Sequence, residues 1–161
     1  MTVRLIERID EVPAAAWDAC AGGENPFLSH AFLSALEASR SAVPEAGWAP
    51  RHLIAEDARG AIVAAAPMYL KSHSYGEYVF DHSWADAYRR AGGRYYPKLL
   101  IAVPFTPVPG PRILIRPGAG SAGTRRALID ALAQIAERLG VSSLHANFCT
   151  EEESRAFAEA G

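Results

Sequence analysis

Hydrophobic and polar residues follow helical spacing in several separate segments of the chain. The clearest segment spans residues 124–139, where apolar side chains recur on one face and Gly140 marks the end, which predicts a long amphipathic helix. A second segment starts with Asn25 and Pro26, a typical cap followed by a typical first residue, and predicts a helix over residues 27–36. Shorter helices are predicted over residues 13–20, 81–91, with Ser83 as its N-cap, and 151–161.

Extended segments lie between these helices. Residues 51–57 and 61–73 are separated by a short turn that contains Gly60, which predicts a β-hairpin. Pro67 cannot donate a hydrogen bond to a sheet, so we expect the second strand to bend or bulge there. Further strands are predicted over residues 3–9, 99–103, 112–116 and 142–148. The order β-α-α-β-β-α-β-β-α-β-α predicts a mixed α/β fold of the α+β kind.

The overall composition limits the size and the partners of the protein. The 161 residues suffice for one domain with a genuine hydrophobic core. The 16 basic and 18 acidic side chains give a net charge of −2, which provides no general attraction for nucleic acid or for an anionic membrane. We therefore predict neither partner, although residues 71–98 carry a mild local excess of positive charge.

The two cysteines and the N-terminus bear on the cellular compartment. Cys20 and Cys149 are far apart and neither has a metal-type spacing with histidine, which predicts free thiols and no metal site. The N-terminus lacks the basic start and long apolar segment of a secretory signal. No apolar run approaches the roughly 20 residues needed to span a bilayer. We expect a soluble, cytoplasmic protein.

The stretch over residues 66–116 has no single periodicity. Tyrosine, histidine, lysine and aspartate are interleaved there, whereas a segment that only packs against a core keeps its polar residues on one face. Tyr95 and Tyr96, which precede Pro97, could line a pocket or pack in the core. We interpret the stretch as the functional surface.

Several residues of this stretch could take part in chemistry. His73 and His82 are candidate general bases because imidazole titrates near neutral pH, although lone histidines more often have a structural role. Asp81 and Asp86 flank Trp84 and could orient an amine or pair with Arg89, or they could form a solvated helix face. The predicted catalytic residues are His73, His82, Tyr75 and Asp81. The predicted substrate-binding residues are Tyr69, Lys71, Tyr78, Trp84, Asp86, Tyr88, Tyr95, Tyr96 and Lys98.

A glycine-rich turn, GAGSAG over residues 118–123, joins the predicted strand RILIR to the long helix. Glycine lets backbone N–H groups surround a phosphate at a helix N-terminus, so the turn is either a phosphate or CoA site or a plain connection. A dinucleotide site of the Rossmann type is not expected, because the N-terminal half lacks an alternating βαβ order. The predicted donor-binding residues are Arg116, Gly118, Gly120, Gly123, Thr124 and Arg125.

A family resemblance rests on two blocks of sequence. Residues 68–112, MYLKSHSYGEYVFDHSWADAYRRAGGRYYPKLLIAVPFTPVPGPR, resemble the characteristic block of the bacterial FemAB-like family, and residues 25–37, NPFLSHAFLSALE, resemble its N-terminal helix. The family consists of predicted N-acyltransferases of the GNAT superfamily and is linked by name to peptidoglycan biosynthesis or recognition. The resemblance implies a GNAT-like fold, with a mixed, mostly antiparallel sheet flanked by helices. It also implies that acyl-CoA or a related donor binds at the strand–turn–helix junction.

The resemblance further implies an activity. An N-acyltransferase would transfer an acyl or aminoacyl group to an amine on a small molecule or peptide. Acyl-CoA would be a co-substrate rather than a tightly bound cofactor, and a nucleic-acid partner would arise only if aminoacyl-tRNA were the donor. The alternative is a non-catalytic GNAT-like module that binds a cell-wall precursor or peptide through the tyrosine-rich segment.

The same resemblance gives an expectation about domain organisation. Longer members of the family continue into a second acyltransferase-like half. Residues 1–161 would then form a single GNAT-like domain that corresponds to the N-terminal half. An open sheet edge would be left, which could support a homodimer.

Overall fold

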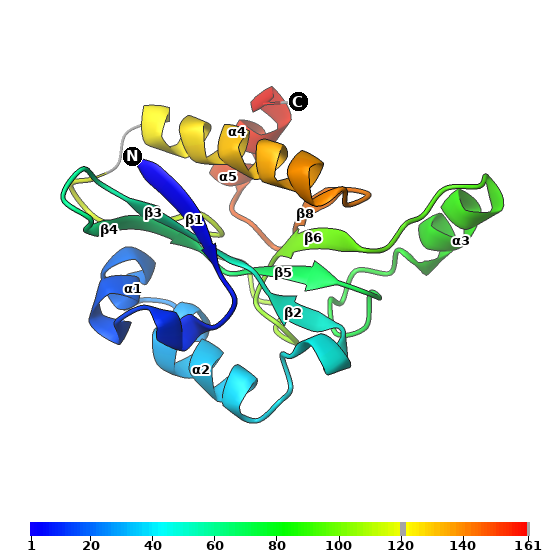
Figure 1. Ribbon diagram of the computed structural model, residues 1–161, viewed down its shortest axis with the longest axis horizontal. Coiled ribbons are helices and arrows are strands. Elements are labelled where there is room, and N and C mark those ends of the chain that lie inside the picture. Colours follow the sequence, from blue (N-terminus) through cyan, green and yellow to red (C-terminus); the bar gives the residue numbers. More distant parts are fainter. Residues whose placement is uncertain (120–121, 161) are drawn as a thin grey trace.

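The computed structural model describes residues 1–119 and 122–160. Within these residues the strands form two four-stranded sheets, in the orders β1-β3-β4-β7 and β2-β5-β6-β8. Two extended segments, residues 48–56 and 62–71, continue from one sheet into the other, so the two sheets lie one after the other along the molecule (Figure 1). The strands are β1 (Thr2–Ile6), β2 (Trp48–Pro50), β3 (His52–Glu56), β4 (Ile62–Ala66), β5 (Met68–Lys71), β6 (Lys98–Ile101), β7 (Leu114–Ile115) and β8 (Leu144–Ala146).

Strand pairing confirms the mixed, mostly antiparallel prediction. The β6–β8 pair is parallel, whereas β1–β3, β3–β4, β4–β7, β2–β5 and β5–β6 are antiparallel. The predicted hairpin is formed by β3 and β4, and the expected break at Pro67 separates β4 from β5. The break falls at Pro67 because proline has no N–H to contribute to the ladder.

Helices cover both faces of the first sheet. Helices α1 and α2 lie on one side and α4 and α5 on the other. Helix α3 stands apart on a projecting segment, residues 75–94, which we call the arm (Figure 1). Alternation along β3 supplies both cores, since Ile54 packs with Trp17 and Leu33 on the α1–α2 side, and Leu53 packs with Leu128 on the α4 side. The helices are α1 (Ala14–Ala21), α2 (His30–Ala38), α3 (His82–Arg90), α4 (Ala122–Leu139) and α5 (Glu151–Ala160).

Two predicted helix starts were wrong. Asn25 does accept a hydrogen bond from the backbone of Phe27, but it caps a short 3₁₀ turn over Pro26–Leu28. The extended backbone of Ser29 then separates this turn from α2, and the Ser29 side chain caps α2. Helix α3 begins at His82, before the predicted cap Ser83.

The strand predicted over residues 112–116 is shorter in the structure. Only Leu114 and Ile115 pair with β4. The backbone N–H groups of Arg112 and Ile113 instead donate to the buried carboxylate of Glu153, at 2.8–2.9 Å. A side chain from α5 thus replaces a neighbouring strand at this point.

Candidate functional site

The base of the arm is held by a buried charge network centred on Lys98. Its Nζ donates to Glu77 Oε2 at 2.9 Å, to Asp81 Oδ2 at 2.6 Å and to Ser74 Oγ at 3.0 Å. The Lys98 side chain is fully buried on the first residue of β6, and the two carboxylates reach it from the arm. A chain segment with little core of its own is thereby fixed to the second sheet.

Two tyrosines complete this network. Tyr95 donates its hydroxyl proton to Asp81 Oδ2 at 2.8 Å, and the hydroxyl of Tyr96 lies 2.7 Å from Ser74 Oγ. Burial raises the pKa of Asp81, but hydrogen bonds from Lys98, Ser74 and Tyr95 outweigh it and bring that pKa down to about 2. Burial, opposed by Lys98, raises the pKa of Glu77. Asp81 is therefore an ion-pair partner and not a poised acid or base.

Lys71 is a second buried amine beside this network. Its Nζ lies 3.5 Å from the centroid of the Trp48 ring and 3.9 Å from Glu77 Oε1. Burial, reinforced by the charge of Lys98, lowers the pKa of Lys71 to about 7, although Glu77 acts in the opposite direction. Both lysines were predicted to bind substrate. The structure places both in the interior, where the charge of Lys98 holds the arm.

Tyr69 was also predicted to bind substrate and is also buried. Its ring lies between Trp48 and His52, with centroids 5.3 and 5.1 Å away. Its hydroxyl has no hydrogen-bond partner among the described residues, and burial raises its pKa. Tyr69 packs in a core cluster with Trp48 and Leu100.

The structure gathers three of the four predicted catalytic residues into a row. The His73 and Tyr75 rings are 5.0 Å apart, and the Tyr75 and His82 rings are 5.7 Å apart. Burial lowers the pKa of His73, and its Nδ1 accepts a hydrogen bond from the backbone of Tyr75. With Nδ1 used as an acceptor, neutral His73 carries its proton on Nε2 and has no free basic nitrogen. His82 is exposed.

The remaining predicted substrate-binding residues lie on the arm surface. Tyr78, Trp84 and Tyr88 are exposed, and Asp86 pairs with Arg89 at 2.6 Å. The pair bears out one of the alternatives given by the sequence. The arm therefore presents an aromatic surface to solvent.

The predicted donor site lies at the other end of the molecule. Arg116 donates its backbone N–H to Val63 at 2.9 Å, and Gly118 turns the chain with a φ of +81° towards α4. Gly120 lies outside the described residues. Gly123 and Thr124 are in the first turn of α4, and the next residue, Arg125, forms an ion pair with Glu152 of α5.

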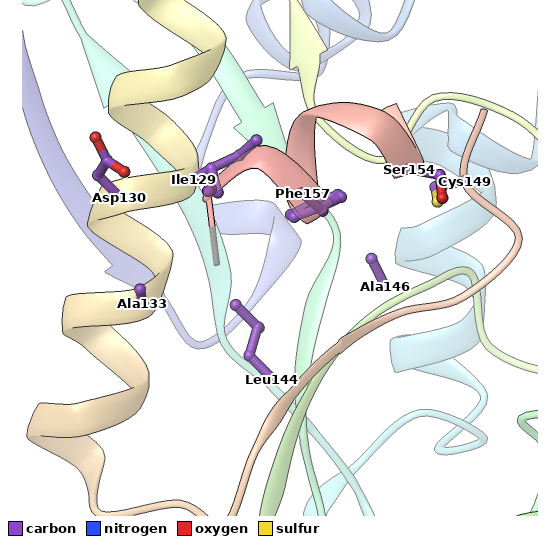
Figure 2. Close-up of a pocket in the computed structure, with 9 residues that line it drawn as sticks. Ile129, Asp130, Ala133, Leu144, Ala146, Cys149, Ser154 and Phe157 are labelled. Atoms are coloured by element: carbon purple, nitrogen blue, oxygen red, sulfur yellow. The ribbon is translucent and has the colours of Figure 1, made fainter. Parts of the chain in front are cut away.

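Two adjacent hollows open between α4 and α5. The larger, with a volume of about 420 Å³, lies between α4, β8 and α5, and Figure 2 shows Ile129 on α4, Phe157 on α5 and Leu144 on β8 among its lining side chains. The smaller, of about 300 Å³, shares Ile129 with the larger, and its other lining residues are Arg125, Arg126, Arg155, Glu152, Glu159 and Ala156. The other residues that line the larger hollow are Asp130, Ala133, Ala146, Cys149, Ser154 and Ala160.

Residues that the sequence did not single out lie at the end of β8. Cys149 lines the larger hollow. Burial, and to a lesser extent the negative charge of Glu153, raises the pKa of its thiol, which therefore stays protonated at neutral pH. Nearby, the buried side-chain Nδ2 of Asn147 has no acceptor among the described residues. The backbone carbonyl of Asn147 accepts a hydrogen bond from Arg112 Nε at 2.7 Å. A lone cysteine after a short strand gives no local sequence signal.

Over residues 1–119 and 122–160, no group of histidine, cysteine, aspartate and glutamate side chains could hold a metal ion. Across the same part of the chain, no helix has the length and apolar character required to cross a membrane.

Comparison with known proteins decides the family. Residues 8–161 match the sequence model of the FemAB-like family, described as peptidoglycan biosynthesis/recognition. The chain belongs to the FemAB-like family. No curated protein matches it in sequence.

Solved acetyltransferases share the fold of this FemAB-like chain. An aminoglycoside 6′-N-acetyltransferase of Acinetobacter baumannii is 14% identical, with a TM-score of 0.50, and the match covers 99% of this chain and 87% of that one. A second aminoglycoside N-acetyltransferase, solved with CoA, is 13% identical over 99% and 90% of the chains, with a TM-score of 0.52. A third, from Acinetobacter haemolyticus, is 15% identical over 99% and 88%, also at 0.52. The fold is GNAT-like, as the sequence resemblance implied.

The predicted site residues of this family member divide into three groups. One group is buried around Lys98, a second forms the exposed aromatic arm, and a third surrounds the start of α4. The hollows between α4 and α5 lie beside the third group. The comparisons establish the family and the fold of this chain.

Proposed function

We propose that the protein transfers an acyl or aminoacyl group from an activated donor to an amine acceptor of peptidoglycan metabolism. The pair of adjacent hollows between α4 and α5 carries this proposal. A GNAT-like fold supports it, and one neighbour in the same fold was solved with CoA. The family description supports an acceptor from the cell wall.

The arginine-lined hollow suits the phosphates of acyl-CoA. Arg125, Arg126 and Arg155 converge there from α4 and α5. The positive end of the α4 dipole adds to the attraction for an anion. Arg125 Nε is buried without an acceptor among the described residues, so a phosphate oxygen would satisfy an otherwise unpaired donor.

The larger hollow suits the acyl end of the same donor. It continues from Ile129 along the apolar side chains Leu144 and Phe157, and it reaches Cys149. The acceptor nitrogen would attack the donor carbonyl carbon, so that a C–N bond forms as the C–S bond breaks. The protonated thiol of Cys149 would give its proton to the departing sulfur and recover one from the nitrogen, which balances the reaction.

Donor binding can be tested with a pair of exposed alanines on α4. Ala133 lines the larger hollow, whereas Ala127 lies on α4 outside the lining of either hollow. In calorimetry with acetyl-CoA and longer acyl-CoAs, Ala133→Trp should weaken binding at least about tenfold, and Ala127→Trp should not. Equal affinities in the two variants would place the donor elsewhere.

Cys149 can be tested separately from donor binding. Cys149→Ser should lower kcat by about a hundredfold with little change in KM for the donor, because a hydroxyl is a much weaker acid than a thiol. The measurement is the release of free CoA in the presence of a muropeptide amine. If no acyl-CoA binds to the wild-type chain while a muropeptide binds tightly, the non-catalytic alternative is correct.

A further inference from the structure

The arm, residues 75–94, carries many of the exposed aromatic side chains. Phe80 is 87% exposed and Trp84 is 73% exposed. Among the described residues, six of the ten large apolar side chains that are exposed lie within the arm. These six are Tyr75, Tyr78, Val79, Phe80, Trp84 and Tyr88.

Helix α3 turns its apolar face away from the protein. Trp84 and Tyr88 are four residues apart and share one face, while Asp86 and Arg90 lie on the opposite face. An amphipathic helix normally covers a core with its apolar face, yet no residue of α3 is buried. The helix projects from the body of the molecule (Figure 1). On its aromatic face the Tyr88 ring lies 6.2 Å from that of Tyr95, whereas Trp84 stays 73% exposed.

The exposed charge of the arm is positive. Its carboxylates Glu77 and Asp81 are buried against Lys98 and contribute no exposed negative charge. Arg90 and Arg94 are exposed, and neither forms an ion pair with the residues that the structure describes. Their charges remain available, since the exposed Asp86 is already paired with Arg89.

The base of the arm fixes this surface in place. Lys98 binds Glu77 and Asp81, and Tyr95, the first residue after the arm, donates to Asp81. Because the segment is held at both ends, its aromatic side chains are preorganised and do not have to be ordered by a partner.

We propose that the arm docks on an anionic lipid surface. Phe80, Trp84 and Tyr88 would enter the interfacial layer, where aromatic rings are favoured, and Arg90 and Arg94 would meet lipid phosphates. The short helix makes the contact peripheral and reversible. The overall charge of −2 predicts no membrane attraction, but attraction at a surface depends on the local charges within a Debye length of it. This inference goes beyond the proposed acyl transfer and does not depend on it.

Tryptophan fluorescence provides a direct test on the full chain. Trp17 and Trp48 are fully buried, so a change in emission on docking reports mainly on Trp84. Vesicles of phosphatidylcholine mixed with phosphatidylglycerol in equal amounts should shift the emission to the blue and protect it from acrylamide. Pure phosphatidylcholine should do so much less, and added salt should reverse the effect. An unchanged emission with the anionic vesicles would overturn the proposal.

Sedimentation with the same vesicles tests the residues. Phe80→Ser combined with Trp84→Ser should lower the bound fraction at least about tenfold, whereas Leu139→Ser, which alters an exposed leucine at the end of α4, should not. Loss of binding in both variants, or in neither, would contradict the proposal.

The charged side of the arm has its own variants. Arg90→Glu combined with Arg94→Glu should abolish binding to anionic vesicles, and Arg59→Glu in the β3–β4 turn serves as the control. If Trp84 responds to a soluble muropeptide or to a single-stranded oligonucleotide but not to vesicles, the surface binds a soluble partner and the lipid proposal is wrong. Acyl-CoA affinity should be unchanged in all arm variants, which separates this test from that of acyl transfer.

Discussion

The base of the arm and the α4–α5 hollow use charge in opposite ways. The chain has only two lysines, Lys71 and Lys98, and both are fully buried at the base of the arm. At the hollow the cations are arginines in exposed pairs, such as Arg126 with Asp130, where about half of each side chain is open to solvent. The first arrangement fixes a segment to the second sheet, whereas in the second the cations are paired near the surface.

The difference follows from solvation. Buried charges lose their hydration, so each needs a close partner, and removal of one partner leaves the other unsatisfied. Exposed pairs are screened by water, contribute little to stability and exchange partners readily. The buried network thus fixes the position of the arm, whereas the exposed pairs belong to the proposed binding site, and mutations should separate these two roles.

The largest effect is expected at Lys98. Lys98→Met would leave Glu77 and Asp81 buried without their cation, and we expect the free energy of unfolding to fall by about 3–5 kcal/mol. Urea denaturation monitored by circular dichroism would measure it. The matched variant Arg126→Met, at an exposed pair, should cost no more than about 1 kcal/mol. Similar losses in the two variants would show that the network does not hold the arm.

A smaller effect is expected within α5, where two adjacent glutamates differ in burial. Glu153 is buried and accepts the N–H groups of Arg112 and Ile113, whereas Glu152 is exposed in its pair with Arg125. Glu153→Gln should lower the free energy of unfolding by about 2 kcal/mol, because a single amide oxygen replaces a charged two-oxygen acceptor. Glu152→Gln should change it by less than about 1 kcal/mol. Equal unfolding midpoints in urea would contradict the assigned role of Glu153.

The free energy of unfolding should depend on pH because of the titration of Lys71. Its pKa is lowered to about 7 in the folded protein, whereas lysine in an unfolded chain titrates near 10.4. Between these values the unfolded chain binds more protons, so the free energy of unfolding should rise with pH, by up to about 1.4 kcal/mol per unit. As pH falls through about 7 this gain is lost.

The useful window for that measurement is narrow. Burial raises the thiol pKa of Cys20 and Cys149, which makes stability fall once unfolded thiols ionise above about pH 8.5. Urea titrations between neutral pH and that limit should therefore show a positive slope in the wild-type chain and a flat profile in Lys71→Met. A slope that persists in the variant would assign the effect to another group.

Local patterns predicted the elements of this fold better than their tertiary roles. Helix α4 was predicted over residues 124–139 and runs over Ala122–Leu139, because its apolar periodicity extends through many turns. The break at Pro67 follows from one missing N–H group. The short β7 could not be predicted, since the carboxylate that binds the N–H groups of Arg112 and Ile113 comes from Glu153, some 40 residues further along the chain.

The candidate site shows the same limit. The sequence selected Asp81, Tyr95 and Lys98 because of their residue types, but only the fold shows that they bind one another. Cys149 was not selected because its relation to the hollow depends on the packing of α5 against α4. The catalytic role of His82 stays a prediction.

The smallest effect on stability, together with a clear effect on binding, is expected at the exposed arginines. Arg126→Ala and Arg155→Ala remove surface pairs with Asp130 and Glu151, so each should change the free energy of unfolding by no more than about 0.5 kcal/mol. If the arginine-lined hollow holds donor phosphates, the double variant should nevertheless weaken acyl-CoA binding about tenfold or more in calorimetry. Arg138→Ala, at the far end of α4, is the control and should leave affinity unchanged. A stable double variant with wild-type affinity would remove the hollow from the donor site.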